Sequence, residues 1–592
     1  MPSYTAPQKD ILFLLKEVLN IDEVLDFQYF KDVDMDLVEP IISEAAKITE
    51  QEIQPLNQPG DQQGCSFKDG IVTTPKGFKE AYQAFVDGGW MSLNSSPEFG
   101  GQGLPKMLQV ALDEMLTSAN VSFSLYAVLS QGAAHALQDH GSDLLKDKFL
   151  HKLVSGEFTG TMCLTEAHCG TDLGLLRTKA TKINDGSYSI TGTKIFITSG
   201  EHDLTDNIIH MVLARLPDAP KGVKGISMFL VPKFLVHDDG SLGERNGVYC
   251  GSIEHKMGIK ASSTCVMNFD NAKGYLIGEA NKGMQTMFSM MNIERINIGL
   301  EGLGLSEVSY QNALAYAKDR LQSRSLTGAK YPDKQADPLL VHPDVRRMLL
   351  TMKAYNEGNR ALALFAARLV DTSKHHPDAK QRELADNLMA IITPVIKAFF
   401  TDTGFECTNL GLQVFGGHGY ISEWGMEQFV RDARIAQIYE GANGIQALDL
   451  VKRKLVMNEG VFLNQLTEIM SAFITACHDK TELNEFVAPL ESYLKTLVDV
   501  SYWIINQAQT HPNVVGSSAT DYLKLLGLVI LGFMWLKIVA VASKKQEQDN
   551  FYKGKILTAR FYFKKLLPEV NTLKEKIMAG ADSLMDMDED LF

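Results

Sequence analysis

A block of short strand-like segments interrupts an otherwise helical sequence, and this order limits what the chain can fold into. From Phe158 to about residue 282, runs such as GSYSITGTKIFITSG and GISMFLVP are separated by Gly, Asp, Asn and Pro, as expected for β strands. On either side, apolar residues recur three and four positions apart, as in LPKMLQVALDEML, which is typical of amphipathic helices. We therefore expect a multidomain α+β fold with a β domain between two helical domains.

The changes of pattern divide the chain into five segments. With 592 residues and about 100 to 200 residues per domain, several domains are expected. Helical periodicity returns after Gly283 and continues, with one polar interruption, to about Leu455. The predicted segments are an N-terminal extension (1–35), an N-terminal helical domain (36–157), a middle β domain (158–282), a second helical domain (283–457) and a C-terminal helical extension (458–592).

Charge and cysteine content argue against several classes of protein. The 57 basic and 72 acidic side chains leave a net charge of −15, which repels polyphosphates and disfavours a dedicated nucleic-acid binder. A local basic patch stays open, because residues 544–576 carry nine basic and four acidic side chains. The 7 cysteines are scattered and never form a CxxC pair, so we expect a reducing compartment without a disulfide framework or zinc ribbon.

The N-terminal segment and the most apolar run predict neither export nor a membrane span. Met1 to Asp10 has no apolar signal core and no Arg-rich amphipathic stretch, so we expect a cytoplasmic protein. The longest apolar run, Leu525 to Leu536, has twelve residues, whereas a bilayer-spanning helix needs about 20. We expect this run to form a buried helix.

Three segments carry residue types suited to binding a cofactor: the first is Met162–Asp172, the second is Thr191–Gly200 and the third is Gln413–Gln446. In the first, a strand ending in Thr165 and Glu166 and a turn through Gly170 would present hydroxyl and N–H groups to the polar edge of a ring. In the third, GGHG (residues 416–419) permits the close backbone approach needed where a pyrophosphate crosses a helix start, although a plain helix-initiating turn is the alternative. This run is not GxGxxG and follows no βαβ unit, which disfavours a nicotinamide-type Rossmann site. In this order, the sequences of the three segments are MCLTEAHCGTD, TGTKIFITSG and QVFGGHGYISEWGMEQFVRDARIAQIYEGANGIQ.

Other interpretations of these segments are weaker. Cys163, His168 and Cys169 raise the question of a metal site, but their spacing matches no common motif and a fourth ligand is not nearby, so we expect no metal. The second segment alternates apolar residues and, taken alone, is an ordinary β strand.

In this order, the three segments resemble the successive signatures of the flavin-dependent acyl-CoA dehydrogenase family, from about Asp36 to Leu455. The resemblance implies an N-terminal helical domain, a central β barrel or sandwich, a four-helix bundle that binds flavin, and FAD as the cofactor. The opening MPSYTAPQKDILFLLKEVLN, the chain length and the helical extension after Asn458 resemble the 3-methylmercaptopropionyl-CoA dehydrogenases of dimethylsulfoniopropionate breakdown and their relatives. An extra C-terminal helical domain is therefore expected.

The resemblance assigns residues to the flavin. Phe196, where Trp is more frequent, would face the ring, and Thr198 would direct its hydroxyl to N5. Arg324 would lie near the pyrophosphate of an FAD bound mainly by a neighbouring subunit, which implies a homodimer or homotetramer; a solvated helix end is the alternative for this residue. Asn443 would replace a contact usually made by Thr, which is Ala442 here. The full predicted set is Thr165, Thr171, Phe196, Thr198, Arg324, Gln413, Gly416, Gly417 and Asn443.

Glu440, in IYEGANGIQ, matches the catalytic base of the family. Its apolar surroundings should raise its pKa from about 4.3 toward working pH by desolvation. Some family members carry the base earlier, and Glu294, directly before Arg295, occupies that position here. We assign the role to Glu440 and keep Glu294 as the alternative. The predicted substrate contacts are Thr171, Asn292, Arg295 and Gly441.

The implied reaction is α,β-dehydrogenation of an acyl-CoA to a trans-2-enoyl-CoA. Glu440 would take the α proton while a hydride passes to flavin N5, with the thioester oxygen stabilised by the N–H of Glu440 and the ribityl 2′-hydroxyl of FAD. The substrate is expected to be 3-methylmercaptopropionyl-CoA or a general fatty acyl-CoA, and electron-transfer flavoprotein the acceptor. The alternatives are an acyl-CoA oxidase that uses O₂, a DNA-associated flavoprotein of the same superfamily, and a catalytically silent scaffold.

Overall fold

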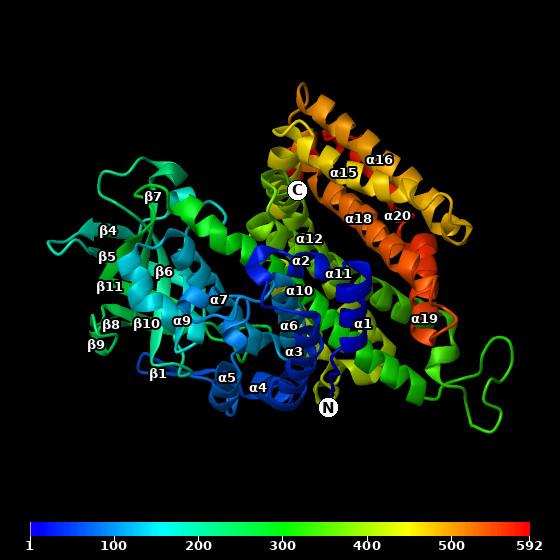
Figure 1. Cartoon of the computed structure of the whole chain (residues 1–592), viewed down its shortest axis with the longest axis horizontal. Coiled ribbons are helices and arrows are strands. Elements are labelled where there is room, and N and C mark those ends of the chain that lie inside the picture. Colours follow the sequence, from blue (N-terminus) through cyan, green and yellow to red (C-terminus); the bar gives the residue numbers. More distant parts are fainter. Residues whose placement is uncertain (1) are drawn as a thin grey trace. The chain divides into compact units, whose positions relative to one another are not determined.

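The computed structural model describes residues 2–592, apart from the side chains of residues 289, 292 and 293. The chain forms two compact units (Figure 1). The first contains the chain up to Ser43, Pro105–Glu114 and Ile298–Phe592, and the second contains Glu44–Leu104 and Met115–Asn297. The units therefore do not follow the order of the sequence, and the first gathers segments from both ends of the chain.

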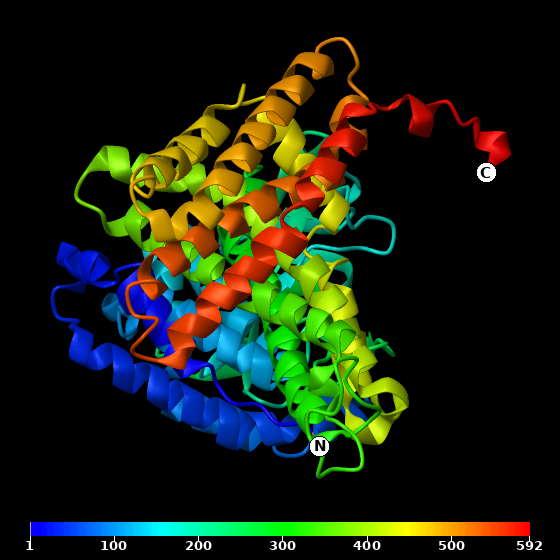
Figure 2. The same ribbon diagram turned by 90° about the vertical axis from the view of Figure 1, so that its right-hand side faces the viewer.

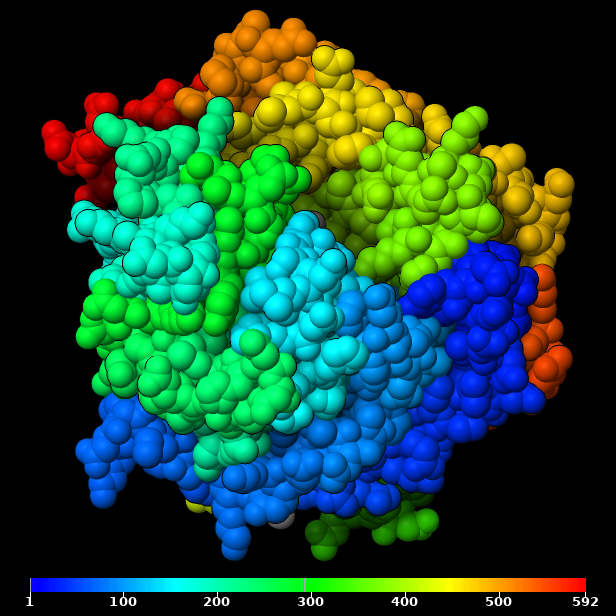
Figure 3. Space-filling model, turned by 60° about the vertical axis from the view of Figure 1, so that its left-hand side comes forward, coloured from blue at the N-terminus to red at the C-terminus, as the bar shows by residue number. Residues whose placement is uncertain are grey.

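A closed β barrel forms the centre of the second unit. β5 pairs with β11 and β4, β4 meets β6 through Lys179 and Arg215, and β7 completes the ring by pairing with both β6 and β11. β3 and β10 extend the sheet, and segments coloured cyan to green reach the surface drawn in Figure 3. The strands are β3 (Phe158–Cys163), β4 (Lys179–Lys182), β5 (Tyr188–Thr198), β6 (Asn207–Arg215), β7 (Ile226–Pro232), β10 (Val248–Ile253) and β11 (Thr264–Ile277). Separate hairpins are β1 (Ser66–Lys68) with β2 (Ile71–Thr73), and β8 (Phe234–Val236) with β9 (Leu242–Arg245).

The barrel is buried on both faces where helices cover it. Along β6, Met211 enters the core shared with helices, whereas the next residue, Val212, points into the barrel core. This double burial explains the continuous apolar sequence of the strand. Helix α7 (Val121–His140) packs on β3, and Gly160 permits the approach, because a Cβ there would lie 2.3 Å from the Cβ of Ala133. The other helices lying wholly in this unit are α4 (Asn57–Gln63), α5 (Phe78–Asp87), α8 (Asp143–Leu145) and α9 (His151–Ser155).

Long helices form the first unit. α11 and α12 pack along each other, and α13 and α14 both contact α12. In Figure 1 the C-terminal helices α15, α16, α18 and α20 lie side by side. Their bounds are α11 (Pro343–His375), α12 (Ala379–Phe415), α13 (Met426–Ala436), α14 (Asn443–Asp449), α15 (Val461–Thr475), α16 (Asn484–Ala508), α17 (Val514–Ser517), α18 (Ala519–Ala542), α19 (Asn550–Phe561), α20 (Glu569–Met578) and α21 (Asp582–Met585). Near the N-terminus lie α1 (Gln8–Phe13) and α2 (Asp22–Leu25), whereas α3 (Met35–Ile48), α6 (Lys106–Ala119) and α10 (Gly283–Asp319) have residues in both units.

Helix α18 contains the long apolar run, and the prediction of a buried helix is confirmed. It contacts α11, α12, α16, α19 and α20, and Gly527 permits close packing because a Cβ there would lie 2.6 Å from the ring of Phe399. Two segments, Ala379–Tyr420 and Ala519–Ala542, are long and apolar enough to cross a membrane by length and composition. Their apolar windows are 72% and 89% buried inside the protein, as in core helices.

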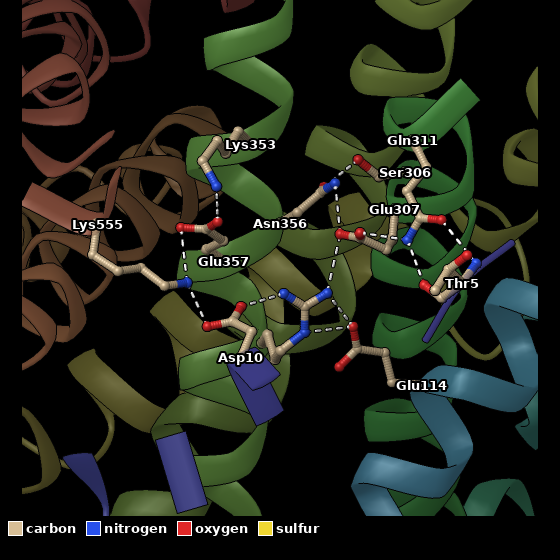
Figure 4. Close-up of polar contacts among 11 residues, drawn as sticks. Thr5, Asp10, Glu114, Ser306, Glu307, Gln311, Lys353, Asn356, Glu357 and Lys555 are labelled. Carbon is tan, nitrogen blue, oxygen red and sulfur yellow. Dashed lines mark hydrogen bonds and ion pairs between the residues drawn. The ribbon is translucent and has the colours of Figure 1, made fainter. Parts of the chain in front are cut away.

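A buried group of charges joins both ends of the chain to the helices of the first unit. Its members, here called the Arg360 cluster, are Asp10, Glu114, Glu307, Glu357, Arg360 and Lys555 (Figure 4). Arg360 lies 2.6 Å from Asp10, 2.6 Å from Glu114 and 3.0 Å from Glu307. Lys555 of α19 pairs with Asp10 of α1 and lies 3.0 Å from Glu357. The two terminal extensions are therefore parts of one folded core.

Beyond this cluster, the C-terminal segment uses several of its basic residues in ion pairs. These pairs are Lys545 with Glu17, Arg560 with Glu485 and Lys576 with Asp521. Because these charges have acidic partners inside the unit, they contribute less to a basic patch than their number in residues 544–576 suggests. The last residues, 582–592, project from the helices at the C-terminal end (Figure 2).

Candidate active site

Glu440 lies in the connection between α13 and α14, residues 437–442, here called the Glu440 loop. Glu440 has φ of 54° and the following Gly441 has φ of 83°. A non-glycine residue in this left-handed region costs roughly 1–2 kcal/mol, so neighbouring contacts must hold it. The Gln446 side-chain N–H donates to the carbonyl oxygen of Glu440 at 3.1 Å, and a Cβ on residue 441 would lie 2.6 Å from that nitrogen. The turn therefore requires glycine at 441, whereas Glu440 adopts the left-handed conformation at a cost, and its side chain is half-buried.

Asn443 anchors the end of this loop to α12. Its side-chain oxygen accepts a hydrogen bond from Lys397 at 2.8 Å, and its amide nitrogen donates to Thr401 at 2.9 Å and to Asp402 at 2.7 Å. Gln437, at the start of the loop, donates to the same Asp402 oxygen at 2.7 Å. Asn443 thus has a positioning role in the loop, and its predicted contact with a flavin stays a prediction.

Sequence analysis missed the group next to Glu440. The hydroxyl of Tyr439 donates a hydrogen bond to Glu301, a buried residue of α10. Burial raises the pKa of Glu301 to about 8; the Tyr439 hydrogen bond and Lys397 oppose the shift, and the charge of Glu440 adds to it. The available signal was a single carboxylate in the apolar, glycine-rich helical stretch INIGLEGLGL, where a buried charge is costly.

The glycine-rich turn ends a helix, whereas the sequence predicted that it begins one. Gly416 caps α12 with φ of 59° and ψ of −136°, and a short 3₁₀ turn follows. A side chain on Gly416 or Gly417 would meet no atom of the described chain within 4 Å, so this backbone faces open space, and Gln413 beside it is exposed. The turn is itself fixed by His418, which bonds Tyr316 at 2.9 Å and stacks on Trp424.

Arg324 organises the loop that follows α10. Its guanidinium donates to the carbonyl oxygens of Tyr331 at 3.0 Å and Lys334 at 2.5 Å, and lies 3.4 Å from Asp337. Burial would raise the pKa of Asp337, but backbone N–H donors, including that of Ser325, and the charge of Arg324 lower it to about 2. The predicted contact of Arg324 with a pyrophosphate stays a prediction.

In the second unit, strand β3 ends at Cys163, so Thr165 and Glu166 follow the strand and do not end it as the sequence predicted. Burial would raise the pKa of Glu166, but Lys194, 2.9 Å away, and hydrogen bonds from Thr178 and the N–H of Arg177 lower it to about 2. The loop after Glu166 closes as a tight turn, because Glu166 and Cys169 exchange backbone hydrogen bonds of 2.9 and 3.0 Å. Thr165, directly before this turn, is half-buried.

Phe196 lies on a bulge of β5. Opposite it, the register of β11 shifts between Cys265 and Met267, and Phe196 itself has φ of 58°. A bulge redirects the side chain of a strand, and here the ring of Phe196 is 58% exposed, although neighbouring Ile197 is 2% exposed. Thr198, two residues on, is half-buried. An exposed aromatic face on a strained strand position is suited to stacking on a flat ligand.

Glu294, the alternative base, and the predicted substrate contacts differ in accessibility. Glu294 is 1% exposed and packs over Gly132, whose added Cβ would lie 2.4 Å from its carboxylate oxygen. Arg295 lies over the ring of Phe288 at 6.0 Å. Thr171 is exposed. The side chain of Asn292 lies outside the described residues, so its predicted contact is not tested.

One group resembles a metal site, and it contains His168 and Cys169 of the set considered from the sequence, with Glu166 in place of Cys163. Glu166, His168 and Cys169 have ligand atoms within 4.8 Å of one another. The carboxylate of Glu166 already accepts hydrogen bonds from Lys194 and Thr178. Cys163 belongs instead to the barrel core, with its sulfur 3.9 Å from His210. Three ligands with one carboxylate already bonded do not match a structural zinc site.

A helical domain, a β barrel and a helical bundle carrying a glutamate in a Tyr-Glu-Gly loop together define the architecture of an acyl-CoA dehydrogenase. The chain belongs to the acyl-CoA dehydrogenase family, since models of its N-terminal, middle and C-terminal domains match residues 39–157, 161–272 and 281–455. A model described as "Acetyl-CoA dehydrogenase C-terminal like" matches residues 466–588. The protein is an acyl-CoA dehydrogenase, an oxidoreductase acting on the CH–CH group of donors, and the predicted family and fold class are confirmed.

Similar proteins match the whole chain. The 3-methylmercaptopropionyl-CoA dehydrogenase of Ruegeria pomeroyi is 39% identical over 98% of this chain and 99% of its own length. A butyryl-CoA dehydrogenase of Syntrophomonas wolfei is 36% identical over 100% of this chain and 99% of its own length. The structure of Caenorhabditis elegans ACDH-11 in complex with C11-CoA shares the fold, with a TM-score of 0.77 at 19% identity over 99% of this chain and 96% of that one.

Proposed function

We propose that this acyl-CoA dehydrogenase is FAD-dependent and converts an acyl-CoA to the trans-2-enoyl-CoA with Glu440 as the base. The observation that carries the assignment is the Glu440 loop, which holds a half-buried carboxylate in a left-handed turn at a motif position of the family. Glu294, the alternative, is 1% exposed against Gly132. A base must reach the proton that it removes, which favours Glu440.

Several residues fit the predicted cofactor. The exposed ring of Phe196 would stack on the isoalloxazine, with Thr165 and Thr198 as polar contacts. The open backbone at Gly416 and Gly417 would admit the nucleotide half. When bound, FAD supplies the group that accepts a hydride from the β carbon.

The protein itself supplies the proton chemistry. The Glu440 carboxylate accepts the α proton, and its own backbone N–H donates to the thioester oxygen, where negative charge develops. Preorganised donors at such an oxygen make the α hydrogen acidic enough for a carboxylate to remove. The bonds from Gln446, Asn443 and Gln437 keep the loop in place for both tasks.

The substrate, acceptor and assembly are finer proposals. Similar proteins are named for a methylmercaptopropionyl thioester and for butyryl-CoA, which supports a short acyl chain. We propose 3-methylmercaptopropionyl-CoA or a general fatty acyl-CoA as substrate, electron-transfer flavoprotein as acceptor and a cytoplasmic homodimer or homotetramer. Oxygen uptake during turnover would instead assign the protein as an oxidase.

Anaerobic titration of the purified yellow protein with a panel of acyl-CoAs tests this function. The flavin should bleach, and Glu440→Gln should lower the bleaching rate by about 10²–10⁴-fold. Glu406→Gln, which changes an exposed carboxylate of α12, is the matched control and should leave the rate unchanged. Normal bleaching by Glu440→Gln, with loss in Glu294→Gln, would transfer the base role to Glu294.

A further inference from the structure

The Glu440 loop is fastened at both ends, and one more contact holds its middle. Gln437 is bonded to Asp402 at the start, and Asn443 is bonded to the same residue at the end. Between them, Tyr439 reaches α10 through its hydroxyl and binds Glu301. This contact restrains the residue directly before the base.

Burying the carboxyl group of Glu301 costs folding free energy. Glu301 is 3% exposed in a helix segment of apolar residues and glycines, where a leucine would pack without burying a carboxyl group. Its hydrogen bond from Tyr439 offsets part of this cost. A buried polar pair of this kind fixes one arrangement of the groups that it joins.

Charged groups on three neighbouring segments face Glu301. They are Lys397 of α12, Asp432 of α13 and Glu440 of the loop. Lys397 is fully buried, and its ammonium also donates to Asn443 at 2.8 Å. The state of Glu301 therefore affects both the position of the loop and the charge that the base experiences.

We propose that Glu301 is a positioning residue for Glu440, holding the loop through Tyr439 so that the carboxylate keeps one orientation. The inference rests on the proposed function of Glu440 as the base. Small displacements of a reacting group carry large rate costs, so the pair should act on the chemical step more than on substrate binding.

Anaerobic flavin bleaching by full-length holoenzyme tests the proposal. Tyr439→Phe and Glu301→Ala should each lower the limiting rate by about tenfold, with the half-saturating acyl-CoA concentration changed by less than about twofold. The double variant should be no slower than the slower single variant, because both remove the same hydrogen bond. Glu301→Gln, whose amide oxygen still accepts a hydrogen bond, should restore most of the rate. Tyr249→Phe is the matched control, since this tyrosine of β10 is 49% exposed.

The pH profile separates positioning from general damage. Ionised Glu301 repels the Glu440 carboxylate, which makes the base stronger, and it accepts the Tyr439 hydrogen bond more strongly. The wild-type bleaching rate should therefore rise as the pH passes about 8, the pKa of Glu301. Glu301→Gln should lose this rise, and Glu406→Gln should keep it.

The outcomes are distinct. Variants that bleach within twofold of wild type, single losses that multiply in the double variant, or a rise near pH 8 that survives in Glu301→Gln would overturn the positioning role while the proposed function stands. Failure of every acyl-CoA to bleach the wild-type flavin would overturn both. Flavin content equal to wild type in each variant shows that a rate loss is not loss of cofactor, whereas a rate loss that follows flavin content overturns the proposal.

Discussion

Two buried carboxylates on one helix, Glu307 and Glu301 of α10, have opposite surroundings. Glu307 accepts from Arg360 at 3.0 Å and from Asn356 at 3.2 Å, inside a cluster with several full charges. Glu301 accepts from a tyrosine hydroxyl, and burial raises its pKa to about 8. The helix thus contains one carboxylate held in ion pairs and another that keeps a proton at neutral pH.

The same residue type therefore has two roles on this helix: Glu307 stabilises the fold through an ion pair, whereas Glu301 can change its charge with pH. A buried ion pair is costly to break, because removing one partner leaves the other charged and desolvated. A neutral acid bonded to a hydroxyl can change its charge without unfolding its surroundings. Variants in each region should therefore fail in different ways.

Arg360→Leu should produce the largest effect. It leaves Asp10, Glu114 and Glu307 buried without their shared cation, so we expect a loss of about 3–5 kcal/mol in the free energy of unfolding. Denaturant unfolding measures this loss. Arg347→Leu, on the same helix but in an exposed pair with Asp344, should cost less than about 1 kcal/mol. Equal losses of unfolding free energy in both variants would contradict the inference that the buried Arg360 cluster stabilises the fold.

Lys555→Met should come next, with a loss of about 2–3 kcal/mol, because Arg360 still compensates Asp10. The variant removes the ion pair that joins α19 to Asp10 of α1, so limited proteolysis should cut the C-terminal helices faster than in wild type. Lys553→Met, an exposed neighbour on α19, should stay within about 0.5 kcal/mol of wild type. Unchanged proteolysis of Lys555→Met would show that the C-terminal helices do not depend on this link.

Glu301→Gln should flatten the dependence of stability on pH. The pKa of Glu301 is about 8 in the folded protein, against about 4.3 in an unfolded chain. The folded state binds more protons between these values, so the free energy of unfolding falls as the pH rises through this window. The neutral amide should remove about 2 kcal/mol of the wild-type decrease between pH 6 and 8. Burial raises the pKa of Glu114 to about 7, and this residue contributes equally to the pH dependence of stability in wild type and in the variant. Parallel curves for the two proteins would exclude titration of Glu301.

Tyr439→Phe should produce the smallest change in stability, about 1 kcal/mol, as expected for one hydrogen bond. Thermal unfolding of the variant, compared with Tyr249→Phe, measures it. A loss as large as that of Arg360→Leu would mean that the Glu440 loop is a structural core like the Arg360 cluster, and the comparison would fail.

The order of helical and β domains and the family motif that contains Glu440 could be read from the sequence, because periodicity and motifs are local signals; the role of Glu440 as the base stays a prediction. The contacts that hold them are long-range: Tyr439 lies 138 residues from Glu301, and Arg360 lies 350 residues from Asp10. Partners that lie so far apart along the chain leave no periodic pattern in the sequence, so neither pairing could be predicted from it. The bulge at Phe196 was also missed, since a positive φ at an aromatic residue depends on the register of its neighbouring strand.

The pairing of Asp10 with Lys555 has a consequence for synthesis on the ribosome. The acid emerges first, and its cationic partner follows 545 residues later. At about 5–20 residues per second, this delay is roughly half a minute to two minutes. During that interval the opening helix cannot complete its final contacts, so the first unit closes only when translation is nearly finished.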